Sequence, residues 1–171
     1  MLVADDIVYR QSPQRVEARG HVRTTFPARE VAGSDPDVGA DDDVVVVARM
    51  LDYDRASGTA VYRGGVRYTD PSHILSSNEL TVRFDMDGQI QEVDASGRVE
   101  IVDLVSGRRM EGEQATRRTD SGVIELRGEP VRLIDEKGNS VSGSSLTWDR
   151  ASGTVSLAGD TETIYQPEEA P

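Results

Sequence analysis

The hexapeptide Asp-Arg-Ala-Ser-Gly-Thr occurs twice in this chain of 171 residues, at 54–59 and again at 149–154, 95 positions later. An aspartate at the start and Ser-Gly at the end are typical of a tight turn, because glycine adopts positive φ without steric cost. Tyr53 and Trp148 stand directly before the two copies, and Leu51 lies two residues before Tyr53. This alternation is typical of a half-buried strand. The repeat therefore predicts a stack of strand-and-turn units.

Five alternating runs of the sequence each centre on a glycine, namely Gly20, Gly64, Gly97, Gly128 and Gly159, with spacings of 44, 33, 31 and 31 residues. In each run the glycine has the same parity as the apolar residues, and in the first and third runs the other parity carries mostly charged residues. Side chains of one parity share one face of a strand. We therefore expect an apolar inner face that includes the glycine column, where the missing side chain permits a bend or a close backbone approach.

These patterns predict an all-β protein of about ten or more strands, with two strands per repeat of about 31 residues. Residues 1–165 are expected to form one domain, with an acidic mobile loop at 27–43 and a polar tail at 166–171. Strand parity places a set of large apolar side chains in the interior: Leu51, Tyr53, Tyr62, Leu80, Val82, Phe84, Val99, Ile101, Ile124, Leu126, Leu133, Leu146 and Trp148. The opposite parity places Arg63, Arg67, Arg98 and Arg127 outside.

The composition excludes several classes of function. The net charge of −12 argues against nucleic-acid binding, which requires clustered Lys and Arg. The chain has no cysteine, and no stretch approaches the roughly 20 apolar residues of a membrane span. No apolar signal-peptide segment follows Met1, but the repeat pattern is already running at Ala4. We expect that a targeting segment has been removed.

No residue pattern indicates catalysis, a cofactor or a metal site. His21 falls on the outward parity, and His73 is placed in a turn after Pro71. The chain has no Gly-x-Ser-x-Gly motif and no Gly-rich phosphate loop before a helix. The acidic residues 41–43 are expected to be a solvated run, and 85–88 a β-turn rather than a calcium loop.

The ordered apolar and glycine positions resemble the OstA-like family of lipopolysaccharide-transport proteins. The resemblance covers roughly 44–165, with a weaker echo in 1–26, and the residues that carry it are Ala48-x-x-Leu51-x-Tyr53-Asp54, Ala60-x-Tyr62-x-Gly64-x-Val66, Leu75-Ser76-Ser77-x-x-Leu80, Ile90-x-x-Val93-x-Ala95-x-Gly97-x-Val99 and Ile124-x-Leu126-x-Gly128-x-Pro130-x-x-Leu133. Gly-Gly-Val at 64–66 and Gly-Arg-Val at 97–99 depart from the family's usual Gly-Asn-Val, and the acidic insertion at 27–43 is unusual.

The resemblance implies a repeat-built, twisted β-jellyroll that is open along one side and lies in the periplasm. Its interior is expected to hold the acyl chains of lipopolysaccharide. The thirteen interior side chains are then the expected lipid-binding residues. Implied partners are LptC-like and LptD-like jellyrolls joined through terminal strands, together with head-to-tail self-association. Trp148, the only tryptophan, is expected to report lipid entry by a change in its emission.

Three alternatives remain open from the residues alone. The interior face can be an ordinary packed core, and the stack can be a self-assembling structural β-solenoid without lipid cargo, since its end strands present unpaired backbone groups. A carbohydrate-active enzyme on a β-scaffold is the third alternative, and it requires paired carboxylates with shifted pKa values in a cleft.

Overall fold

The computed structural model describes residues 1–27 and 43–164, and within these ranges every regular element is a β-strand. The strands are β1 (Leu2–Val3), β2 (Asp6–Gln11), β3 (Gln14–Pro27), β4 (Asp43–Asp54), β5 (Thr59–Thr69), β6 (His73–Phe84), β7 (Ile90–Asp103), β8 (Arg109–Arg118), β9 (Val123–Ile134), β10 (Ser140–Asp149), β11 (Thr154–Ala158) and β12 (Glu162–Ile164). The all-β prediction is confirmed.

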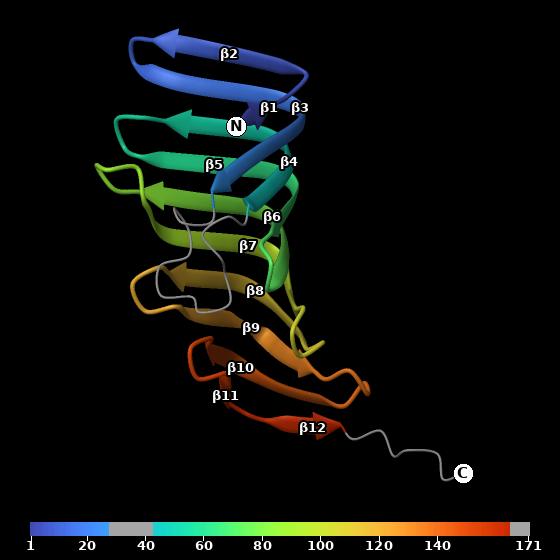
Figure 1. Ribbon diagram of the computed structural model, residues 1–171. Coiled ribbons are helices and arrows are strands. Elements are labelled where there is room, and N and C mark those ends of the chain that lie inside the picture. Colours follow the sequence, from blue (N-terminus) through green and yellow to red (C-terminus); the bar gives the residue numbers. More distant parts are fainter. Residues whose placement is uncertain (28–42, 165–171) are drawn as a thin grey trace.

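The strands form one antiparallel sheet of 12 strands in which each long strand pairs with its neighbours in the sequence (Figure 1). The order runs from β3 to β10 without a crossover. At the N-terminal edge both β1 and β2 pair with β3, and at the C-terminal edge both β11 and β12 pair with β10. Each edge is therefore shared by two short strands.

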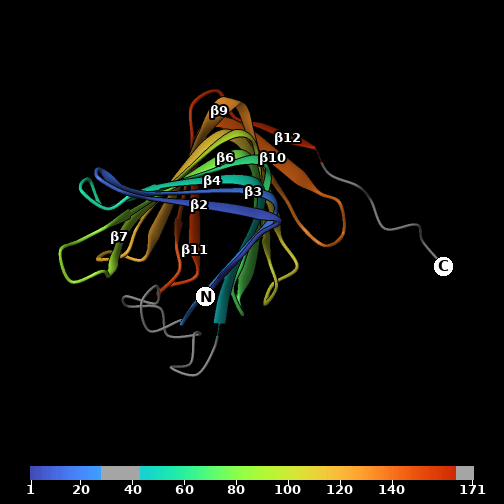
Figure 2. The same ribbon diagram turned by 90° about the horizontal axis from the view of Figure 1, so that it is seen from above.

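A bend in the middle of each long strand divides the sheet into two arms, which diverge when the stack is viewed from above (Figure 2). The pairing register shifts at each bend, for example between Arg19 and Val22 in β3 and between Ser96 and Val99 in β7. We call the arm that contains β2 and β11 the first arm, and the arm that contains β1 and β12 the second arm.

The glycine column lies at these bends. Gly20, Gly64, Gly97 and Gly159 have φ angles of 69°, 87°, 74° and 100°, in the region that only glycine adopts freely. A Cβ atom on Gly64 would lie 2.8 Å from Cβ of Arg49 on the neighbouring strand. The predicted bend and close approach are confirmed, but the inward orientation is wrong for Gly64 and Gly159, which are exposed. At positive φ, Gly64 and Gly65 leave the extended conformation, while Tyr62 and Val66 on either side of them share one parity and are both buried.

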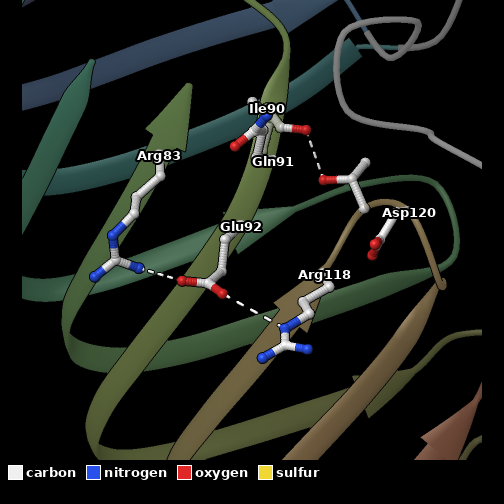
Figure 3. A pocket seen from close by; sticks show the side chains of 7 residues that line it. Arg83, Ile90, Gln91, Glu92, Arg118 and Asp120 are labelled. Atoms are coloured by element: carbon white, nitrogen blue, oxygen red, sulfur yellow. Dashed lines mark hydrogen bonds and ion pairs between the residues drawn. The ribbon is translucent and has the colours of Figure 1, made fainter. Parts of the chain in front are cut away.

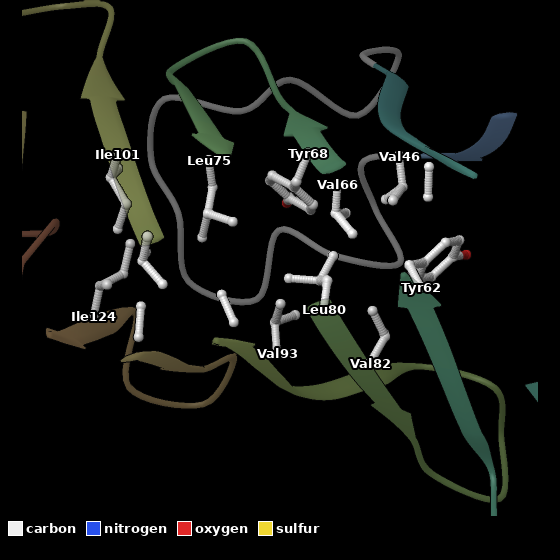
Figure 4. Close-up of a cluster of buried hydrophobic side chains, with 14 of the residues drawn as sticks. Val46, Tyr62, Val66, Tyr68, Leu75, Leu80, Val82, Val93, Ile101 and Ile124 are labelled. Carbon is white, nitrogen blue, oxygen red and sulfur yellow. The ribbon is translucent and has the colours of Figure 1, made fainter. Parts of the chain in front are cut away.

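The apolar core lies between the two arms (Figure 4). Leu80, Ile101 and Leu126 are completely buried. Of the thirteen predicted interior side chains, all are buried except Tyr53, Phe84 and Leu133, which are partly buried against the core. The four arginines predicted to point outward, Arg63, Arg67, Arg98 and Arg127, are all exposed. Strand parity thus separated the two faces correctly on each side of the bend.

The two copies of the hexapeptide form the same turn. The Oδ1 atom of Asp54 accepts hydrogen bonds from the amides of Ala56 and Ser57, at 2.9 and 3.3 Å. The equivalent bonds to Asp149 measure 3.0 and 3.2 Å. The predicted turn at 85–88 is also confirmed, since the Gly88 amide donates to the carbonyl oxygen of Asp85.

The predicted loop 27–43 lies outside the described residues apart from its ends, Pro27 in β3 and Asp43 in β4, and the predicted tail 166–171 lies outside them entirely. In the described part of the chain, no helix has the length and apolar character to cross a membrane. Residues 1–27 and 43–164 also contain no group of three or more His, Asp or Glu side chains arranged to hold a metal ion.

Candidate functional site

A cleft of about 800 Å³ opens between the arms near the N-terminal edge of the sheet. Its first-arm wall comes from β3 to β6 and includes Leu51, Tyr53, Tyr62 and Phe84. The second arm contributes Leu2 of β1 together with Thr24 and Phe26 of β3. The cleft thus lies where the two arms diverge next to the short edge strands.

Aromatic rings form much of the cleft wall. Phe84 lies 6.0 Å from Phe26 and 6.1 Å from Tyr53 between ring centroids, the second pair at 88° to each other. The second pair has the edge-to-face arrangement that aromatic side chains favour, while the first pair is tilted at 40°. Burial raises the pKa of the Tyr62 phenol to about 12, so this side chain is neutral. The wall can therefore contact an apolar ligand without burying a charge.

Charged and exposed residues stand at the rim of the cleft. Arg55 belongs to the first copy of the hexapeptide, and Asp85, Met86 and Asp87 belong to the turn between β6 and β7. Met86 is fully exposed, although methionine is a flexible apolar side chain suited to contact with irregular ligands. An amphiphile could place its apolar part inside and its polar part at this rim.

Four of the thirteen predicted site residues, Leu51, Tyr53, Tyr62 and Phe84, line the cleft. The others lie deeper, where side chains from both arms pack against one another. Their inward orientation is confirmed, and their contact with lipid stays a prediction. Val16 and Phe26 also line the cleft, although the predicted site did not include them.

A buried polar network joins the two arms farther along the stack. Asp70 and Ser72 come from the turn between β5 and β6, at the outer end of the second arm, and His73 is the first residue of β6. Arg117 of β8 and Arg150 of the second hexapeptide come from the first arm. All five residues are at most 8% exposed. They bring together segments 47 and 80 residues apart, counted from Asp70 to the two arginines.

The geometry centres on the carboxylate of Asp70. Its Oδ1 atom accepts hydrogen bonds from the amides of Ser72 and His73, at 2.9 and 2.8 Å, and its Oδ2 atom lies 2.9 Å from Nδ1 of His73. Arg117 and Arg150 each place a guanidinium nitrogen near the same Oδ2, at 3.9 and 4.0 Å. Arg150 also donates to the hydroxyl of Ser72.

Charge states in the network follow from burial and from these partners. Burial by itself raises the pKa of Asp70, but the hydrogen bonds from His73 and the charge of Arg150 outweigh it and lower the pKa, so Asp70 is ionised. Burial lowers the pKa of His73, and Arg150 and Arg117 lower it further against the opposing effect of Asp70. A neutral His73 leaves one carboxylate facing two guanidinium groups.

Sequence analysis missed this network and placed His73 in a turn, whereas the structure has His73 at the start of β6 with its ring buried. One available signal was the parity of Arg117, which matches that of Ala115 on the inner face. His21 was predicted to point outward, and its side chain is 92% exposed beside Asp5, as expected.

The outer face of the first arm carries shallow depressions lined by paired charges. In one of them Glu92 lies between Arg83 and Arg118, and the Thr119 hydroxyl donates to the carbonyl oxygen of Ile90 at 2.6 Å (Figure 3). Because these charged and polar groups pair with one another, this face is less suited to binding an apolar ligand than the cleft is.

Comparison with known proteins gives one family and one fold. The family model described as LptA/(LptD N-terminal domain) LPS transport protein matches residues 45–169, most of the chain. The chain is also similar to the crystal structure of LptH from Pseudomonas aeruginosa, titled the LptA homologous periplasmic component of the lipopolysaccharide transport device. The identity is 21% and the TM-score 0.66, over 78% of this chain and 99% of that one. A search of curated proteins finds no significant match.

Proposed function

Because the chain belongs to the LptA/LptD N-terminal domain family of lipopolysaccharide transport proteins, we propose that it carries lipopolysaccharide across the periplasm with the acyl chains held in the cleft between its arms. Membership of this family makes the chain a transport protein and not an enzyme, as the absence of catalytic motifs predicted.

The observation that carries the proposal is the apolar cleft beside the N-terminal edge. A protein of this size normally fills the space between two sheet layers with side chains. Here Phe26, Tyr53 and Phe84 leave about 800 Å³ open while keeping their rings in contact. This favours a ligand-binding interior over the alternative of an ordinary packed core at this end of the molecule.

Apolar burial supplies the driving force in this proposal. Each methylene transferred from water into the cleft contributes about 0.8 kcal/mol. The net charge of −12 repels a phosphorylated headgroup at long range, so attraction between charges cannot drive binding. Added salt screens this repulsion, so binding should not weaken as the salt concentration rises.

The periplasm is the proposed location. The similar protein LptH is described as a periplasmic component, and the fold of this chain is that of LptH. LptC-like and LptD-like partners are proposed for this chain on the basis of its family membership.

Proposed contacts with these partners, and between copies of the chain, run through the edge strands. Ile7 and Tyr9 of β2 pair with Ala18 and Val16 on the inner face of β3, yet they are 50% and 60% exposed. The apolar interior therefore continues to an uncovered edge, and a strand from a second jellyroll could satisfy the backbone and cover these side chains. Contacts of this heterologous kind propagate head to tail.

Binding of lipid A by two matched variants tests the proposed cargo. Phe84→Asn places an amide in the cleft wall, and Val47→Asn makes the same change in polarity at an exposed position outside the cleft. Native mass spectrometry with lipid A should show a loss of bound lipid for Phe84→Asn and none for Val47→Asn. Equal lipid binding by both variants, each confirmed as folded by circular dichroism, would contradict the cleft as the binding site.

A further inference from the structure

The two copies of the hexapeptide have different surroundings. Arg55 of the first copy lines the open cleft, and Arg150 of the second is buried against the turn between β5 and β6. Likewise Tyr53 packs edge-to-face on Phe84 of the cleft, while Trp148 packs at 81° on His73. In the second copy, the turn at 69–73 occupies the space that is open beside the first.

This turn is held both by hydrogen bonds within itself and by contacts with the opposite arm, among them the hydrogen bond that Arg150 donates to the Ser72 hydroxyl. The Asp70 carboxylate accepts its short hydrogen bonds, at 2.8 and 2.9 Å, from Ser72 and His73 of the same turn. The ion pairs that cross to Arg117 and Arg150 measure 3.9 and 4.0 Å. If the arms separated, the carboxylate would keep its short hydrogen bonds.

The arms also have a structural basis for separating. Each long strand bends where the register shifts, and the β5 bend contains two adjacent glycines, Gly64 and Gly65, both at positive φ. Glycine gives the backbone conformational freedom at such points. A small change in backbone angle at the bends would produce a larger displacement at the outer ends of the arms, where the turn at 69–73 meets Arg117 and Arg150.

We propose that the turn at 69–73, held by Arg117 and Arg150, is a latch that closes the interior beyond the cleft, and that a bound acyl chain reaches Trp148 only when this latch opens. The latch rests on the proposed lipid cargo and adds to it a division of the interior into an open N-terminal cleft and a closed C-terminal part. The lipid contact predicted for Trp148 then requires opening of the latch.

Quenching of tryptophan fluorescence by a lipid A analogue with brominated acyl chains tests the latch, since bromine quenches only at short range. Trp148 is the single natural tryptophan and reports on the closed part. A cleft reporter is made by Tyr53→Trp in a chain that also carries Trp148→Phe. We expect strong quenching of the cleft reporter and little quenching of Trp148 in the natural chain.

The latch is then loosened with Arg117→Met, which keeps an apolar side chain of similar length. The matched control is Arg118→Met, next to it on the exposed outer face. Ser72→Ala, which removes the hydroxyl that accepts from Arg150, serves as a milder second variant if Arg117→Met does not fold. Quenching of Trp148 should rise toward that of the cleft reporter in the latch variants and stay at the natural level in Arg118→Met.

Two results would overturn the latch. The first is quenching of Trp148 in the natural chain that equals the quenching of the cleft reporter in its own variant, which would mean that the interior is continuous. The second is a folded latch variant whose cleft still binds lipid while Trp148 stays unquenched. A cleft reporter that the lipid never quenches would overturn the proposed cargo itself, and with it the latch.

Discussion

Alanine substitution at the two hexapeptide glycines should have unequal effects, although the local sequences are identical. Gly58 and Gly153 have φ angles of 59° and 68°, so alanine meets the same backbone strain of about 1–2 kcal/mol at both. Loss of freedom in the unfolded chain offsets about 0.4–1 kcal/mol of this strain. A Cβ at position 153 meets no atom within 4 Å. Gly153→Ala should therefore lower the free energy of unfolding by about 1 kcal/mol.

At position 58 the new Cβ would lie 2.7 Å from the backbone carbonyl oxygen of Phe84. The end of β6 must move away, which strains the hydrogen bond from the Phe84 amide to the Gly58 carbonyl, now 2.8 Å. Overpacking of this kind costs about 1–3 kcal/mol. Gly58→Ala should therefore destabilise the protein by about 2 kcal/mol more than Gly153→Ala, or by roughly 4–8 °C in Tm.

Urea denaturation followed by circular dichroism measures both variants on one scale. The m-values should match, so that the midpoints report stability alone. Equal midpoints for the two variants would refute the reasoning, because they would show that the end of β6 shifts at no cost. A larger loss for Gly153→Ala would show that the surroundings of the second turn are tighter than the structure has them.

Three further substitutions test the core, the buried network and the edge. Leu126→Ala removes a fully buried side chain and should cost about 2–5 kcal/mol in urea denaturation. Because the pKa of His73 is lowered on folding, the unfolded chain binds more protons below pH 6.5, so stability should fall there by up to about 1.4 kcal/mol per pH unit. This pH dependence of stability should weaken in His73→Gln and persist in His21→Gln. An unchanged pH dependence in His73→Gln would contradict its assignment to His73. Ile7→Lys on β2 should reduce self-association in sedimentation velocity, while Val105→Lys, also exposed but on a turn, should not.

The strands and the identity of the inner face were predictable from sequence because both depend on local period. Leu80 and Val82 alternate with Thr81 and Arg83, and a strand must place alternate side chains on opposite faces. The same reasoning placed Arg63 and Arg98 outside, as the structure has them. The turns were predictable for a similar reason, since Asp54 and Asp149 bond to amides two and three residues away.

Parity failed where the backbone leaves the extended conformation. Gly64 has the parity of Tyr62 and Val66, which are buried, yet it is exposed, because two successive residues at positive φ redirect the chain. Parity also says nothing about a residue in a turn, so neither the burial of Arg150 nor its donation to Ser72 could be predicted.

The duplicated hexapeptide shows what the local sequence determines and what the tertiary structure decides. By itself, the sequence determined that residues 54–59 and 149–154 form the same turn, since its hydrogen bonds join neighbours in the chain. Only the tertiary structure decided that Arg55 lines an open cleft while Arg150 lies buried beside Asp70. The physical reason is the twist and bend of the sheet, which bring the second arm's outer end against β8 and β10 of the first arm, across separations of 47 and 80 residues that no local pattern encodes.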